Sequence, residues 1–194
     1  MMTRGTGIVG YNVQTAVDTQ HHLIVAHEVT NVGSDRDQLS SMAKQAREAM
    51  ASDTLSVVAD RGYFKSEQIL ACHDAGITAY VPKPMTSGAK ADGRFNNDAF
   101  IYDATKNEYI CPAGEALIWH YSYVEKGLKL HRYWSSKCQG CALKSQCTPS
   151  TERRVRRWEH EDVLDEMQLR LSNAPEMMRV RKRTLSIPSG RSNN

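Results

Sequence analysis

The sequence predicts an α/β fold, a mixed sheet with helices, and three observations support this prediction. First, residues 10–18 alternate between apolar and polar side chains, and residues 23–30 form a second run rich in β-branched side chains, so the chain opens with two strands. Second, residues 35–50 carry apolar side chains at helical spacing. Third, short apolar runs at residues 55–59 and 77–81 enclose another helical stretch, which is typical of parallel strands joined by a helix.

The two opening runs are expected to form a hairpin. Val13, Thr15 and Val17 share one side of the first strand, because side chains alternate between the two faces of a strand. The polar residues 19–22 between the runs provide the turn. The second run, Leu23–Thr30, is rich in β-branched side chains, so we expect the second strand to be the more buried one.

The two predicted helices have start and stop signals. Ser34 or Asp35 is placed to cap the first helix. Ser66 is placed to cap the second, which stops at Gly76, a residue that often follows the end of a helix. Cys72 lies on the second helix, and we assign it to core packing because a free cysteine behaves as a small hydrophobic side chain.

The run Leu55–Tyr63, LSVVADRGY, has an acid at the end of a predicted buried strand. Asp60 follows the apolar residues, and Arg61 and Gly62 come next. In α/β sheets, ligands bind beyond the carboxyl ends of the strands, and a carboxylate oxygen there is a hard ligand of the kind that Mg²⁺ prefers. Asp60 is therefore the candidate catalytic residue and magnesium ligand. The structural alternative is that Asp60 caps the next helix or pairs with Arg61.

Four cysteines lie in residues 85–150, which begin as a loop rich in Ser, Gly, Lys, Asp and Asn. Cys138 and Cys141 form a C-x-x-C pair, and Cys111 and Cys147 lie on either side of it. Four thiolates are a usual set of ligands for structural zinc, and a metal would help an insertion that is too small to build much core. These four cysteines are therefore the candidate Zn²⁺ ligands of a zinc-ribbon-like insertion. The alternative is four free thiols in a loop.

The C-terminal half of the chain is basic. Residues 1–107 carry 10 Lys and Arg against 12 Asp and Glu, whereas residues 108–194 carry 15 against 10. A basic half favours a polyanionic partner, and arginines beside an indole ring suit phosphates and bases. We expect residues 151–184 to be a basic helical segment and residues 185–194 to be a disordered tail. Within the segment, an apolar stripe on a helix from about Glu159 to Leu171 is assigned to core packing, and it consists of Val163, Met167 and Leu171 with Leu164 beside them. The candidate DNA-binding residues are Arg153, Arg154, Arg156, Arg157, Trp158, Arg181, Lys182 and Arg183. The alternative is a solvated helix surface.

Composition and hydropathy narrow the class of protein. Hydrophobic residues make up 40% and charged residues 24% of the chain, which predicts a globular protein. No apolar run approaches the roughly 20 residues that a membrane helix needs. Residues 1–4 are not followed by the apolar core of a secretory signal. We therefore expect a cytoplasmic protein without a membrane partner, whose cysteines are thiols or metal ligands rather than disulfides.

Several motifs together resemble those of bacterial insertion-sequence transposases of the DDE type. GYNVQTAVD, LIVAHEVTN, ADRGY and YVPKP occur in this order, and CPAGE, a C-x-x-C-x5-C pattern and an Arg-rich stretch follow. The resemblance implies a ribonuclease-H-like catalytic domain, of which residues 1–84 are a partial core. In that family three carboxylates bind two Mg²⁺ or Mn²⁺ ions, which activate the attack on DNA phosphodiesters at transposon ends. Asp60 matches the second acid of the family, and the cysteine-bearing region matches the insertion before the third.

Two departures from the family pattern predict an inactive, truncated fragment. The first Asp of the family lies ahead of the YNVQ strand, where this chain has only Met1–Gly7 before the alternation. The third acid follows a sequence like Arg181–Thr184 in a phrase such as LEHPFGTIK, but this chain continues with Leu185–Asn193. Codons can be chosen for Ser186–Asn193 such that adding a single G in front of them shifts the reading frame. The shifted frame then encodes EHPFGTIK. We hypothesise a single-base deletion, which the DNA sequence of the gene tests directly.

Three functions remain open from the sequence. The first is a DNA transposase, of which this chain is a catalytically incomplete fragment. The second is a zinc-stabilised DNA-binding or interaction remnant without chemistry, which forms a homodimer or a heteromer with an intact transposase. The third is an unrelated Mg²⁺-dependent nuclease that uses Asp18, Asp60 and Glu176.

Overall fold

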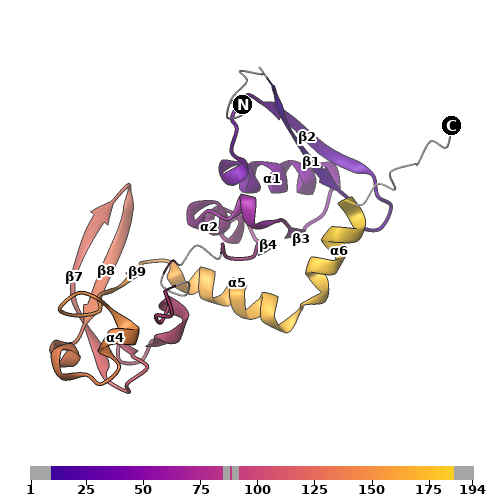
Figure 1. Ribbon diagram of the computed structural model, residues 1–194. Coiled ribbons are helices and arrows are strands. Elements are labelled where there is room, and N and C mark those ends of the chain that lie inside the picture. The colour runs from indigo at the N-terminus through magenta and orange to yellow at the C-terminus, as the bar shows by residue number, and fades with distance from the viewer. Residues whose placement is uncertain (1–9, 85–87, 89–91, 186–194) are drawn as a thin grey trace. The chain divides into compact units, whose positions relative to one another are not determined.

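A computed structural model describes residues 10–84, 88 and 92–185, and these residues form two compact units (Figure 1). The first unit contains the described residues up to Pro84 together with those from Asp162 onward. The second unit contains the described residues between Met85 and Glu161. The predicted tail after Leu185, including Ser186, lies outside the described residues.

The first unit opens with the predicted hairpin. β1 (Asn12–Val17) and β2 (Ile24–Thr30) pair in antiparallel register. A short 3-10 helix, η1 (Asp35–Asp37), then leads into α1 (Leu39–Ala49). Ser34 accepts a backbone N–H of η1, so this predicted cap serves the 3-10 turn rather than α1 itself. The predicted helix over residues 35–50 is therefore a 3-10 turn followed by an α-helix.

The hairpin packs on α1 through small side chains. Gln14 in β1 and Ala26 in β2 are buried, and Ala26 packs against Met42 of α1. Val13 and Val29 lie opposite each other in the register and are both exposed. Each strand thus has one buried residue. The expectation that the second strand is the more buried one is wrong, because strand alternation puts its larger side chains on the exposed face.

A parallel pair of strands follows the hairpin. β3 (Leu55–Val58) and β4 (Ile77–Tyr80) pair in parallel, and α2 (Ser66–Asp74) connects them. This confirms the predicted order of elements and the mixed α/β class. Cys72 of α2 is fully buried, in agreement with its assignment to core packing. Among the described residues, β1–β2 and β3–β4 form two separate two-stranded sheets.

Two helices complete the first unit. α5 (Glu161–Asn173) buries Leu164 and Met167, two residues of the apolar stripe that the sequence shows. It lies against β4, since Arg170 Nη1 donates a hydrogen bond to a backbone carbonyl of that strand at 3.2 Å. α6 (Glu176–Leu185) follows and lies near β3.

The second unit is built around an antiparallel sheet of five strands in chain order. Its connections contain the 3-10 turns η3 (Asn97–Ala99) and η4 (Ser136–Gly140) and the short helix α4 (Lys144–Cys147). The strands are β5 (Ile101–Asp103), β6 (Glu108–Ile110), β7 (Ala116–Glu125), β8 (Leu128–Trp134) and β9 (Val155–Trp158).

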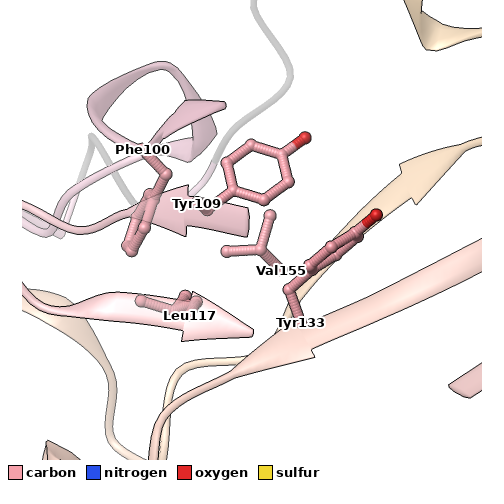
Figure 2. Packing of buried hydrophobic residues seen from close by; sticks show 5 residues of the cluster. All are labelled: Phe100, Tyr109, Leu117, Tyr133 and Val155. Atoms are coloured by element: carbon pink, nitrogen blue, oxygen red, sulfur yellow. The ribbon is translucent and has the colours of Figure 1, made fainter. Parts of the chain in front are cut away.

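The second unit has a hydrophobic core of its own, shown in Figure 2. The buried side chains are Phe100, Tyr109, Leu117, Tyr133 and Val155. The rings of Tyr109 and Tyr133 meet edge to face with their centroids 5.2 Å apart, a favourable arrangement for aromatic pairs. The expectation that this insertion builds little core is therefore wrong, because strands β6 to β9 each contribute a large side chain.

The basic segment begins as a strand, which corrects the prediction that residues 151–184 are helical. β9 forms an edge of the five-stranded sheet, and α-helix begins only at Glu161. Val155 pairs with Tyr133 of β8 and is buried with it, so tertiary packing sets the conformation here. Within the described ranges of the chain, no helix is both long enough and apolar enough to cross a bilayer.

Candidate functional site

Asp60 lies two residues after the last residue of β3 (Val58) and is held by two hydrogen-bond donors. Its Oδ1 accepts the backbone N–H of Gly62 at 2.8 Å, so Asp60 caps the 3-10 turn η2 (Arg61–Tyr63). Its Oδ2 accepts a hydrogen bond from Arg181 Nη2 of α6 at 2.8 Å. The structural alternative, in which Asp60 is a helix cap, is thus found in the structure. The ion pair of Asp60 is formed with Arg181 and not with Arg61. The Asp60 side chain remains 44% exposed, so water still reaches it.

A second carboxylate lies beside Asp60. Asp35 Oδ1 accepts hydrogen bonds from Asn12 Nδ2 and Gln14 Nε2, each at 2.7 Å. A Cβ atom placed on Gly62 would lie 2.9 Å from Asp60 Oδ1 and 3.6 Å from Asp35 Oδ2, so both carboxylates border this glycine. Sequence reasoning considered Asp35 only as a helix cap. The signal it missed is the pair of amide side chains at alternate positions of β1, which point to a shared polar partner.

Tyr63 connects these groups. Its hydroxyl donates a hydrogen bond to Gln14 Oε1, which ties η2 to β1. Burial raises the pKa of Tyr63, and the negative charges of Asp35 and Asp60 raise it further. The phenol is therefore a neutral hydrogen-bond donor beside two carboxylates.

A cavity of about 540 Å³ opens between β1 and β3. Both strands line it along their whole length, and Asp35, Asp60 and Tyr63 belong to its wall. Apolar side chains of α1 and α6 line it as well. Among the described residues, β1 pairs only with β2 and β3 only with β4, so each strand has one edge without a partner strand.

The described residues do not by themselves complete a metal centre at Asp60. Within the described ranges, no group of three or more His, Cys, Asp or Glu side chains is arranged to hold a metal ion. Asp18 and Glu176, the carboxylates of the nuclease alternative, are absent from the wall of the cavity. Asp18 instead binds its own turn, where the backbone N–H of His21 lowers the pKa of this carboxyl.

The four candidate zinc ligands come together in the second unit. Cys111, Cys138, Cys141 and Cys147 all line one small cavity of about 30 Å³. Burial raises the pKa of the Cys147 thiol, and the other three cysteines raise it further, although Arg153 opposes them. The four sulfur atoms are therefore neighbours, but their present arrangement is not that of a metal centre.

The candidate DNA-binding residues divide between the interior and the surface. Arg157 and Trp158 of β9 are buried, and the Arg157 guanidinium lies 3.8 Å from the centroid of the Tyr102 ring. Arg154 and Arg156 are exposed on the same segment.

The other candidates have varied surroundings. Arg153 is partly buried, and its Nη2 donates a hydrogen bond to Asn97 at 2.8 Å. Arg181 belongs to the Asp60 site, and Arg183 is exposed on α6. Lys182 lies on α6, but its side chain is outside the described structure.

Comparison with known protein families gives a match to a transposase domain. The family described as "Transposase DDE domain" has a model that matches residues 2–163, which is most of the chain. No curated protein and no solved structure matches the chain.

Proposed function

Because the chain belongs to the family of transposase DDE domains, we propose that it binds DNA through a ribonuclease-H-like first unit and a sheet-containing second unit, without cutting DNA by itself. The order of a hairpin, a helix and two parallel strands supports the ribonuclease-H-like assignment. Asp60 lies just beyond the carboxyl end of β3, the position that favours a catalytic acid in such a sheet.

The proposal that the chain does not cleave DNA rests on the hydrogen bonds that Asp60 already accepts from the protein. Both oxygens of this carboxylate accept hydrogen bonds from the protein, one from Gly62 and one from Arg181. A cation at Asp60 would be opposed by the positive charge of Arg181, which is held 2.8 Å from Asp60 Oδ2. Asp35 is the nearest further carboxylate, and it already accepts two amide N–H groups. Two carboxylates that are already hydrogen-bonded in this way do not fit the group of carboxylate ligands that binds two Mg²⁺ or Mn²⁺ ions.

A nicking assay tests this proposal. Supercoiled DNA that carries the ends of the parent element is incubated with the purified chain and Mn²⁺, and we expect the DNA to stay intact. Binding of the same DNA should weaken steeply with salt, as phosphate contacts require. Nicking by the wild-type chain that disappears in Asp60→Ala would show an active metal site and refute the proposal. Nicking that is lost in both Asp60→Ala and Asp18→Ala, and that also occurs on DNA without the ends of the element, would instead favour the nuclease alternative.

We also propose that the four clustered cysteines of the second unit bind structural zinc. The support is that all four line the same cavity, which a tetrahedral ion would fill once the sulfur atoms draw in around it. Protein purified with zinc present should contain about one zinc per chain, and Cys138→Ser should lower this content and the thermal stability together. Cys72→Ser, which changes a cysteine of the first unit, is the matched control for zinc content. Wild-type protein without bound zinc would contradict the proposal.

A further inference from the structure

We infer that one face of strands β7, β8 and β9 binds unpaired nucleotides of DNA, an inference that rests on the proposed function and assigns its DNA contact. We call this surface the aromatic–arginine face. Its rings belong to His120, Tyr121, Tyr123 and Trp134, and its cations belong to Arg132, Arg154 and Arg156.

The strand register brings these side chains to the same side of the sheet. Directly opposite residues of antiparallel strands share a face. Tyr121 of β7 lies opposite Arg132 of β8, and Arg132 lies opposite Arg156 of β9. Trp134 is two residues from Arg132 and therefore projects to the same side. The other face carries Tyr133, which belongs to the hydrophobic core.

The rings of this face form a connected set. The rings of His120 and Trp134 are stacked, with centroids 3.3 Å apart and planes 5° from parallel. The ring of Tyr121 lies 5.9 Å from the rings of both Tyr123 and Trp134. His120 and Tyr121 are exposed although they lie in the middle of a strand. A sheet that exposes aromatic rings in a row provides a surface on which bases stack.

The arginines supply the charge that a nucleic acid requires. The guanidinium of Arg132 lies 5.1 Å from the centroid of the Tyr123 ring, and that of Arg154 lies 5.0 Å from the centroid of the Trp134 ring. Arg132 forms no ion pair with any carboxylate of the described residues, and its buried Nε has no hydrogen-bond partner there. Arg154, in contrast, pairs with Glu152 at 2.8 Å, so a phosphate would have to compete with this carboxylate for its charge. Arg156 is 58% exposed and meets Glu125 only at 3.8 Å. Positive charge interleaved with aromatic rings matches a strand of phosphates and bases.

Unpaired nucleotides fit this face better than a duplex. In a duplex the flat faces of the bases are stacked on one another and only their edges and phosphates are open to a protein. Exposed aromatic rings reach the flat faces of bases only where the strand is single or the bases are turned outward. A surface of phosphate contacts alone would need the arginines but not the rings.

Binding of short oligonucleotides tests the inference. A labelled oligodeoxythymidine of about 12 nucleotides is titrated with the full chain without divalent metal, and fluorescence anisotropy is recorded. This length lies within the roughly 4 to 16 nucleotides that one OB-fold, a known single-strand-binding domain, covers. A duplex of the same length is titrated in parallel. We expect tighter binding of the single strand, and Tyr121→Ala should weaken it about 10-fold because a stacked ring is lost. Tyr121→Phe keeps the ring and should bind like the wild type.

Trp119→Ala is the matched control for Tyr121→Ala. Trp119 is also an exposed aromatic residue of β7, but it lies opposite Tyr133 and so belongs to the other face. Equal loss in Trp119→Ala and Tyr121→Ala, no loss in Tyr121→Ala, or equal affinity for the duplex would overturn the inference. The nicking assay measures cleavage with Mn²⁺, whereas this titration measures binding without divalent metal. The outcome for the proposed lack of cleavage is therefore decided independently of this result.

Discussion

Arg181 shows how a single residue changes the interpretation of a site. It belongs to a basic cluster whose sequence favours contact with phosphates, yet its guanidinium pairs with Asp60, which lies 121 residues earlier in the chain. The position of Asp60 at the end of a strand follows from the local pattern LSVVADRGY. Its partners do not, because Arg181 and Asp35 reach the site from distant segments. Local sequence patterns therefore identify Asp60 as the candidate catalytic acid, but they do not predict which charged residues surround it.

A second prediction at the scale of a single residue concerns the thiol of Cys72. Burial raises the pKa of this thiol from 9.0 to about 11, so the thiolate is disfavoured in the folded protein. The resulting contribution to stability is complete below pH 9.0 and is lost as the pH rises through about 11. Between about pH 8 and about pH 10.5, the free energy of unfolding in urea should fall more for wild type than for Cys72→Ala. An equal fall in the two proteins would contradict the assignment.

Individual elements were predictable where their signals are local. The hairpin, α2 and the parallel strands follow from alternation, helical spacing and breakers, and each is found in the structure. The prediction that Ser66 caps α2 is wrong, because Ser66 is the first residue of the helix and Lys65 occupies the cap position without a side-chain hydrogen bond. β9 was not predictable, because VRRW fits either a helix or a strand and its pairing with β8 decides between them. The stripe on α5 was read correctly from its spacing, although the strand against which it packs lies far back in the chain.

The burial of α5 can be measured with a matched pair of substitutions. Met167 is 1% exposed and Leu169, on the same helix, is 62% exposed. Met167→Ala should lower the free energy of unfolding by about 2 to 5 kcal/mol, because it removes buried apolar contacts and leaves a cavity. Leu169→Ala should change it by less than about 0.5 kcal/mol. Chemical denaturation of both variants checks this, and similar losses for the two would show that α5 does not pack as described.

At the level of the whole molecule, the chain combines two units with separate cores. The α/β unit carries Asp60, and the antiparallel sheet carries the four cysteines and the aromatic–arginine face. The family match extends over the whole range of the second unit and over part of the first. Sequence reasoning recognised both parts by their motifs. It underestimated the second because the large core residues of that unit are scattered from Phe100 to Val155 rather than gathered in one apolar run.

Within the described residues, β1 and β3 each have one edge without a partner strand. Both strands line the same cavity, and Tyr63, beyond the end of β3, donates a hydrogen bond to Gln14 of β1. An extended polypeptide that paired with both edges would join the two small sheets into one. Unpaired strand edges are templates for such pairing with another chain. Association of copies through these edges would rise with protein concentration.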